Sequence, residues 1–139
     1  YNRPQPAGII EHFTRLADGC DLPIIIYNVP PRTGIDLDFD TLTAISAIPT
    51  VIGIKDASGD VARVSVTRLQ LGKDFLQFSG CDDSALGFMS MGGAGCISVT
   101  SNIAPRLCAE FQQACRSGAW ERALALHELL FPLHQALFS

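Results

Sequence analysis

Short apolar segments recur along the sequence, and each of them runs into polar or glycine-rich residues. Apolar residues occupy consecutive positions in these segments and β-branched residues are frequent, a pattern typical of strands buried on both faces of a parallel sheet. Four such segments are predicted as strands: residues 22–27, 51–55, 75–79 and 95–99.

Longer segments with helical periodicity separate the predicted strands. Their apolar residues recur three or four positions apart, and Asp or Pro stands near their starts, as is usual at helix N-termini. The predicted helices cover residues 7–17, 38–47, 61–71 and 83–91. This regular alternation predicts an α/β fold made of βα units around a parallel sheet.

Helical periodicity alone continues after the fourth predicted strand. Asn102 is predicted to cap a helix over residues 104–117, which Gly118 ends. A second helix is predicted to follow, because residues from Trp120 to Leu137 recur three or four positions apart, and Pro132 is expected to kink it or split it.

Four parallel strands with their helices leave open sheet edges, and the sequence begins with a loop-like Tyr1-Asn2-Arg3-Pro4 segment that no strand precedes. A (β/α)8 TIM barrel needs eight strands to close, so we expect four more in a preceding segment. Residues 1–118 are therefore predicted to be the C-terminal half of such a barrel, and residues 119–139 the start of a C-terminal helical region. A chain with only these residues could not close a barrel, and we expect it to be inactive by itself.

Composition and charge exclude several classes of protein. The formal net charge is −4 and the ten Lys and Arg residues form no basic stripe, which argues against nucleic-acid binding. Five cysteines without CxxC spacing argue against a disulfide framework and a zinc site. His12, His127 and His134 are predicted to be surface or helix-packing residues far from the strand ends. Apolar runs too short for a bilayer span, and the absence of a signal pattern, predict a cytoplasmic protein without membrane contact.

The candidate catalytic and binding residues lie where the predicted strands end. Lys55 closes an otherwise apolar strand, where desolvation disfavours the ammonium form and leaves an amine able to attack a carbonyl as a Schiff-base nucleophile. Tyr27 closes the preceding strand and would shuttle protons on the same rim. Arg32, in a turn framed by Pro and Gly, would present a forked donor to a substrate carboxylate. The alternatives are a snorkelling strand-end lysine, a structural tyrosine and a surface arginine.

Five segments resemble the dihydrodipicolinate synthase family of pyruvate-dependent aldolases, both in their residues and in their order and spacing: YNRP, LPIIIYNVPPRTG, GIKDASGD, FSGCDDSAL and GGAGCISVTSN. The resemblance covers nearly the whole chain. The resemblance implies a lyase of diaminopimelate and lysine biosynthesis. Lys55 would condense with pyruvate, and the enamine would add to the aldehyde of L-aspartate semialdehyde before cyclisation releases the enzyme. It implies no metal and no organic cofactor.

The resemblance also implies roles for five further residues. Tyr27 matches a proton-relay tyrosine, Arg32 the arginine that holds the semialdehyde carboxylate, Ile97 a residue lining the pyruvate pocket, and Gly80 a pocket glycine. Tyr1 matches the tyrosine that reaches across a tight dimer interface into the neighbour's relay, and the family assembly is a homotetramer made of two such dimers. The family's GTTGE-type loop and most of its lysine-feedback site would precede Tyr1.

Two other functions remain open at this point. A related lyase, such as N-acetylneuraminate lyase or a keto-deoxy sugar acid aldolase, would share the Schiff-base lysine and accept a sugar-derived aldehyde. Arg32 favours the synthase, because those lyases generally lack an arginine at that position. In the other alternative, the chain is a non-catalytic half-barrel that acts only as an assembly module, and Lys55 is an ordinary strand-end residue.

Overall fold

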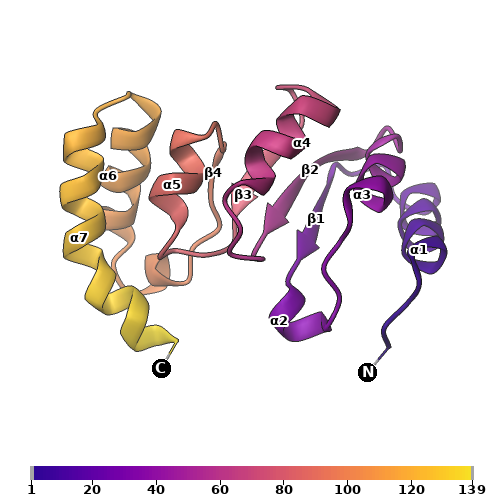
Figure 1. Ribbon diagram of the computed structural model, residues 1–139, viewed down its shortest axis with the longest axis horizontal. Helices are drawn as coiled ribbons and strands as arrows, with labels where there is room; N and C mark the ends of the chain where they lie inside the picture. The colour runs from indigo at the N-terminus through magenta and orange to yellow at the C-terminus, as the bar shows by residue number, and fades with distance from the viewer. Residues whose placement is uncertain (1, 139) are drawn as a thin grey trace.

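A computed structural model describes residues 2–138 of the chain. Four parallel strands form one sheet in sequence order, β1-β2-β3-β4 (Figure 1). The strands are β1 (Ile24–Asn28), β2 (Val51–Asp56), β3 (Leu76–Ser79) and β4 (Gly95–Cys96). The helices are α1 (Pro6–Asp18), α2 (Pro30–Thr33), α3 (Phe39–Ser46), α4 (Arg63–Leu71), α5 (Ala85–Ser90), α6 (Pro105–Arg116) and α7 (Trp120–Leu137), with a short 3-10 turn, η1 (Thr100–Asn102), before α6.

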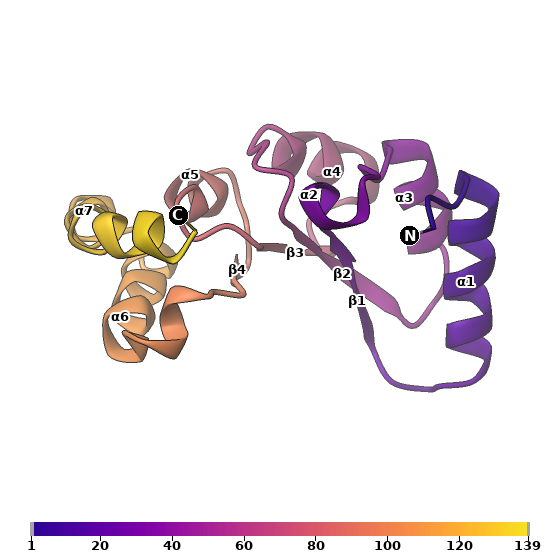
Figure 2. The ribbon, with the colours of Figure 1, turned by 90° about the horizontal axis from the view of Figure 1, so that it is seen from below.

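Within residues 2–138, helices cover one face of the sheet only. Figure 2 shows α1, α3, α4 and α5 arranged in an arc along the sheet. Burial alternates accordingly along β1, where Ile26 and Asn28 are buried while Ile25 and Tyr27 are exposed. The expectation of strands buried on both faces was therefore wrong for residues 2–138, because these residues supply helices for a single face.

Two separate apolar clusters hold the helices. The first lies between β1, β2, α1 and α3 and has the buried residues Ile26, Leu37, Leu42, Ile45, Val51 and Ile54. The second is formed mainly by α5, α6 and α7 and has the buried residues Ala85, Met89, Cys108, Phe111, Ala114, Cys115, Ala123, Leu126 and Leu130. Each cluster buries large aliphatic or aromatic side chains, worth roughly 1.5–3 kcal/mol apiece when fully removed from water.

The fourth strand is shorter than the pattern predicted. It ends at Cys96 instead of residue 99, because the Asp82 carboxylate accepts hydrogen bonds from the backbone N–H groups of Val99 (2.8 Å) and Thr100 (3.2 Å) and draws the chain out of the sheet. Asn102 does not cap α6 either. Its side chain donates to the carbonyl of Val99 within the 3-10 turn, and Ala104 stands at the N-cap position of α6.

The C-terminal helices agree better with the sequence. Gly118 adopts a φ of 74° between α6 and α7, a conformation that favours glycine and ends the first helix where predicted. Helix α7 continues through Pro132 as one element, so the proline does not split it. Figure 1 shows the helix changing direction in its last turns, as expected where a proline removes one backbone donor.

Candidate active site

Lys55 and Tyr27 lie side by side at the carboxyl ends of β2 and β1. The parallel register pairs Tyr27 with Lys55 and Asn28 with Asp56, so the first pair shares the open face of the sheet. Lys55 Nζ lies 3.9 Å from the centroid of the Tyr27 ring, a cation-π distance. The amine is thus held over the aromatic ring of a neighbouring strand, with its side chain only partly buried.

A hollow of about 640 Å³ opens beside this pair. It brings together Tyr27, Arg32, Lys55 and Gly80 with residues of the β3–α5 and β4–α6 connections, including Asp82 and Val99. Ile97 is outside this lining; it is 44% exposed and donates its N–H to Ser79 O (2.9 Å). Tyr1 lies outside the described residues. Of the six predicted site residues, four therefore share one hollow.

Arg32 is carried by the short turn helix α2 directly after β1. Pro30 and Pro31 start this turn, and Gly34 ends it with a φ of 70° and an N–H bond to Pro30 O (2.8 Å). Proline at the start and glycine in the left-handed conformation at the end suit a tight excursion of the chain. The exposed Arg32 guanidinium is thereby presented on the same hollow as Lys55.

Gly80 allows the ends of β2 and β3 to approach each other closely. Its N–H donates to Asp56 O (2.6 Å), and a side chain at this position would place its Cβ 2.7 Å from the Cβ of Ala57. Any larger residue would have to push the β3 end away from the strand that carries Lys55. This requirement gives a geometric reason for glycine in the wall of the hollow.

A buried polar cluster lies beneath the strand ends, and the sequence reasoning missed it. Asp56 accepts hydrogen bonds from Ser58 N (2.8 Å), Arg63 Nε (2.9 Å) and Asn28 Nδ2 (3.4 Å). Asn28 and Asp56 directly follow Tyr27 and Lys55, and successive strand side chains point to opposite faces. The cluster could have been inferred from the sequence, because a polar residue directly follows each of two candidate site residues in otherwise apolar strands.

The β4 side of the hollow is fixed by a second buried carboxylate. Asp82 is bonded to the N–H groups of Val99 and Thr100, and the Thr100 hydroxyl lies 2.7 Å from His134 Nδ1 of α7. The expectation that His134 lies far from the strand ends was wrong, because it contacts the segment that follows β4. Burial lowers the pKa of His134 below its usual value of 6.5, although the nearby Asp82 acts in the opposite direction.

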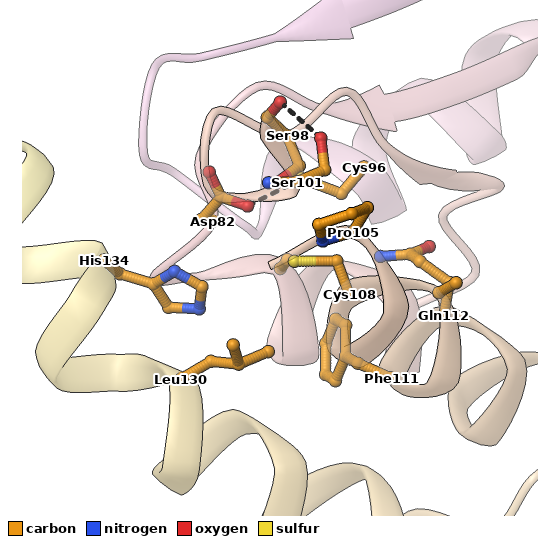
Figure 3. Close-up of a pocket in the computed structure, with 12 residues that line it drawn as sticks. Asp82, Cys96, Ser98, Ser101, Pro105, Cys108, Phe111, Gln112, Leu130 and His134 are labelled. Carbon is orange, nitrogen blue, oxygen red and sulfur yellow. Dashed lines mark hydrogen bonds between the residues drawn. The ribbon is translucent and has the colours of Figure 1, made fainter. Parts of the chain in front are cut away.

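A smaller cavity of about 210 Å³ lies behind this second carboxylate, between β4 and helices α5, α6 and α7. Figure 3 shows Asp82, Ser98 and Ser101 at one end of it and Phe111 and Leu130 at the other. Its walls include the Cys96 thiol, whose pKa burial raises to about 12. The thiol is therefore protonated at neutral pH and unsuited to act as a nucleophile.

All five cysteines are free thiols. Within residues 2–138, no three His, Cys, Asp or Glu side chains are grouped closely enough to hold a metal ion. No helix in the same range has the length and apolar character needed to cross a membrane.

The fold and the site together define an α/β chain whose parallel strands bring a lysine, a tyrosine and an arginine to one hollow at their carboxyl ends. The chain belongs to the Dihydrodipicolinate synthetase family, whose sequence profile matches residues 1–139. It is 63% identical over 139 residues to the 4-hydroxy-tetrahydrodipicolinate synthase of Rhizorhabdus wittichii and 57% identical to that of Sphingopyxis alaskensis. Each alignment covers 100% of this chain and 48% of the relative.

Solved structures of dihydrodipicolinate synthases are also similar to this chain. The dihydrodipicolinate synthase of Aquifex aeolicus superposes with a TM-score of 0.96 at 35% identity, over 99% of this chain and 47% of that one. The 4-hydroxy-tetrahydrodipicolinate synthase of Methylacidiphilum fumariolicum SolV gives 0.96 at 37% identity, over 99% and 46%. The chain thus spans about half the length of the relatives it matches.

Proposed function

We propose that this chain is part of a 4-hydroxy-tetrahydrodipicolinate synthase, a lyase that condenses pyruvate with L-aspartate semialdehyde in diaminopimelate and lysine biosynthesis. The observation that carries the proposal is the strand-end pair, with Lys55 Nζ 3.9 Å from the Tyr27 ring centroid beside a hollow that Arg32 also lines. Membership of the family supports the same reaction.

In this proposal the Lys55 amine attacks the keto carbon of pyruvate. The Tyr27 hydroxyl passes protons while the carbinolamine loses water to form the imine. Loss of a methyl proton gives the enamine, whose carbon adds to the aldehyde of the semialdehyde. Attack of the semialdehyde's amino group on the imine carbon then closes the ring and releases Lys55. The imine itself accepts the electrons, so the reaction needs neither a metal nor an organic cofactor.

The other predicted residues have supporting roles in the same reaction. Arg32 would hold the carboxylate of the semialdehyde with its forked donors. Gly80 and Ile97 would border the pyruvate, Gly80 because it leaves room where a side chain would collide with Ala57. Tyr1 would reach from a neighbouring subunit into the proton relay. We accordingly propose a cytoplasmic homotetramer, a dimer of dimers. Light scattering tests the assembly directly. The test matters because one solved relative is described as a monomeric variant.

We further propose that residues 1–118 are the C-terminal half of a (β/α)8 barrel and residues 119–139 the start of a C-terminal helical region. Three observations support this assignment. Beyond β1 and β4 the described residues add no strand, one sheet face has no helix over it, and the relatives are about twice as long. After β4 the alternation of strand and helix gives way to α6 and α7, as expected after the last strand of a barrel.

Steady-state kinetics of the full-length protein test the proposed function. We expect turnover with pyruvate and aspartate semialdehyde, and none with sugar-derived aldehydes. Arg32→Ala should raise the KM for the semialdehyde about 100-fold, since a charge-assisted bidentate contact is lost, and should change the KM for pyruvate little. Preference for a sugar-derived aldehyde, or an equal effect on both substrates, would contradict the synthase assignment and favour the related lyases.

A further inference from the structure

The residues that directly follow Tyr27 and Lys55 form a buried cluster on the opposite face of the sheet. Asn28 is 4% exposed and Asp56 8% exposed, although both are polar. With Asp36 and Arg63 they make up what we call the strand-end clamp. Each clamp residue of β1 and β2 shares a peptide bond with a site residue, so the clamp lies directly behind Tyr27 and Lys55.

One end of the clamp is the Asp56 carboxylate. Its Oδ1 accepts from Ser58 N, and its Oδ2 accepts from Arg63 Nε at 2.9 Å and from Asn28 Nδ2 at 3.4 Å. These donors come from β1, the loop after β2 and the first residue of α4. The carboxylate therefore joins the two strands that carry Tyr27 and Lys55 to a helix on the outer face.

The other end of the clamp fastens the chain where it returns from the turn that carries Arg32. Asn28 Nδ2 donates to Asp36 Oδ1 (2.8 Å), and Asn28 Oδ1 accepts from Leu37 N (3.1 Å). Arg63 Nη2 donates to Leu37 O (2.6 Å), and its Nη1 lies 3.6 Å from Asp36 Oδ2. The turn thus begins directly after Asn28, and the segment in which it ends, Asp36 and Leu37, is hydrogen-bonded to the Asn28 side chain.

Within the described residues, the hydrogen bonds of the turn itself are local, and the Arg3 side chain from the start of the chain lies beside Gly34. The Thr33 hydroxyl bonds to Val29 O and Ile35 O, both within the excursion, and residues 31–34 are exposed. The position of Arg32 relative to Lys55 is therefore set at the base of the turn, where the clamp holds both ends. The centroid of the Phe39 ring lies 4.7 Å from the guanidinium carbon of Arg63, so the ring covers the clamp on one side.

We propose that Asn28, Asp56 and Arg63 are positioning residues that set the place of Arg32 relative to Lys55, and thereby the capture of the carboxylate-bearing aldehyde. The inference rests on the proposed function, in which Lys55 binds the first substrate and Arg32 the second. The inference separates two steps of the reaction. Imine formation at Lys55 requires only the end of β2 in place, whereas capture of the second substrate also requires the turn that carries Arg32 to be held by the clamp.

Arg63→Met in the full-length protein tests this assignment, because methionine fills similar space and donates no hydrogen bond. We expect the KM for the semialdehyde to rise at least about tenfold, since misplacement by about 1 Å can cost about 100-fold. The KM for pyruvate and the yield of borohydride-trapped pyruvate adduct on Lys55 should stay within about twofold. The matched control is Arg68→Met, on the same helix, where the arginine donates to Gly92 O (3.2 Å) away from the clamp; it should change neither.

A double-mutant cycle distinguishes positioning from general stability. If Arg63 acts through Arg32, then Arg63→Met should add less than about twofold to the semialdehyde KM in an Arg32→Ala background. Additive effects, or an equal loss for both substrates, would overturn the assignment. Should Arg63→Met fail to fold, Asp36→Asn gives the same comparison with a milder change, because the Asp36 side chain is 51% exposed. Absence of any adduct in the unsubstituted protein would instead refute the proposed function.

Discussion

The β1–β2 side and the β3–β4 side of the molecule each place a buried carboxylate near the hollow, but the two are held differently. Asp56 is bound by the Arg63 guanidinium, the Asn28 amide and one backbone N–H. Asp82 is bound by two backbone N–H groups, at Val99 and Thr100, and lies 3.9 Å from the Cys96 thiol. The first carboxylate is held mainly by side chains from separate elements, and the second mainly by the backbone of one loop, with one long hydrogen bond from the Cys96 thiol.

The two sides should therefore tolerate substitution differently. Both oxygens of Asp56 accept from N–H donors, so an amide at this position must turn its NH2 group toward another donor. Only Oδ2 of Asp82 accepts from the backbone, so an amide could keep both of those bonds through its remaining oxygen. The same substitution is thus predicted to be costly on one side and mild on the other.

The largest effect is expected for Asp56→Asn. It removes the nearer of the two charge partners of Arg63, whose side chain is only 11% exposed, and sets an amide NH2 against an N–H donor. Breaking a buried ion pair by changing one partner costs about 3–5 kcal/mol, so we expect a loss near the lower end of that range, because Asp36 remains near Arg63. Urea unfolding of the full-length protein measures it. A loss below about 1 kcal/mol would mean that the side-chain network does not hold this region.

Asp82→Asn should have a smaller effect. The amide oxygen can still accept from Val99 and Thr100, and the lost charge weakens those bonds, so we expect about 1–2 kcal/mol in the same unfolding measurement. Asp82→Ala, which leaves the N–H groups of Val99 and Thr100 without this acceptor, should cost more than Asp82→Asn. If Asp82→Asn were as damaging as Asp56→Asn, the distinction between side-chain and backbone anchoring would fail.

The smallest expected effect is a pH dependence confined to the β3–β4 side. Because burial lowers the pKa of His134 in the folded chain, the unfolded chain takes up this proton first as the pH falls. Stability is then full above about pH 6.5 and decreases as the pH falls toward the folded pKa. His134→Gln should flatten this part of the stability profile, whereas His12→Gln, on α1 in the other region, should leave it unchanged. An equal slope in the His134 variant would show that another group is responsible.

The sequence was sufficient for the order of the strands and of the longer helices, although not for α2 or the 3-10 turn, and for the four residues that share the hollow. Hydrophobic periodicity predicted every strand to within a few residues, and the strand-end positions of Tyr27 and Lys55 were enough to expect them on one rim. Asp38 was predicted near a helix start and caps α3, where its side chain accepts from Thr41 N (2.7 Å). Such features depend on residues close together in the chain.

Features that join distant segments were missed. The early end of β4 depends on Asp82 capturing two amides 17 and 18 positions away, and the buried position of His134 depends on Thr100, 34 positions away. Similarly, Asp56 and Arg63 become a clamp only when the turn after β1 returns beside them. Hydrophobic periodicity carries no information about such long-range polar partners, because it records burial and not pairing.

The central claim is that Lys55 forms an imine with pyruvate, and borohydride reduction followed by peptide mapping tests it most directly. Two lysines occur in the chain, Lys55 and Lys73. Lys73 lies in the exposed loop before β3, at the opposite end of the sheet, and serves as an internal control. In the full-length protein treated with pyruvate, we expect one reduced adduct on the peptide containing Lys55, and its loss in Lys55→Arg but not in Lys73→Arg. An unmodified Lys55, or equal labelling of Lys73, would contradict the account.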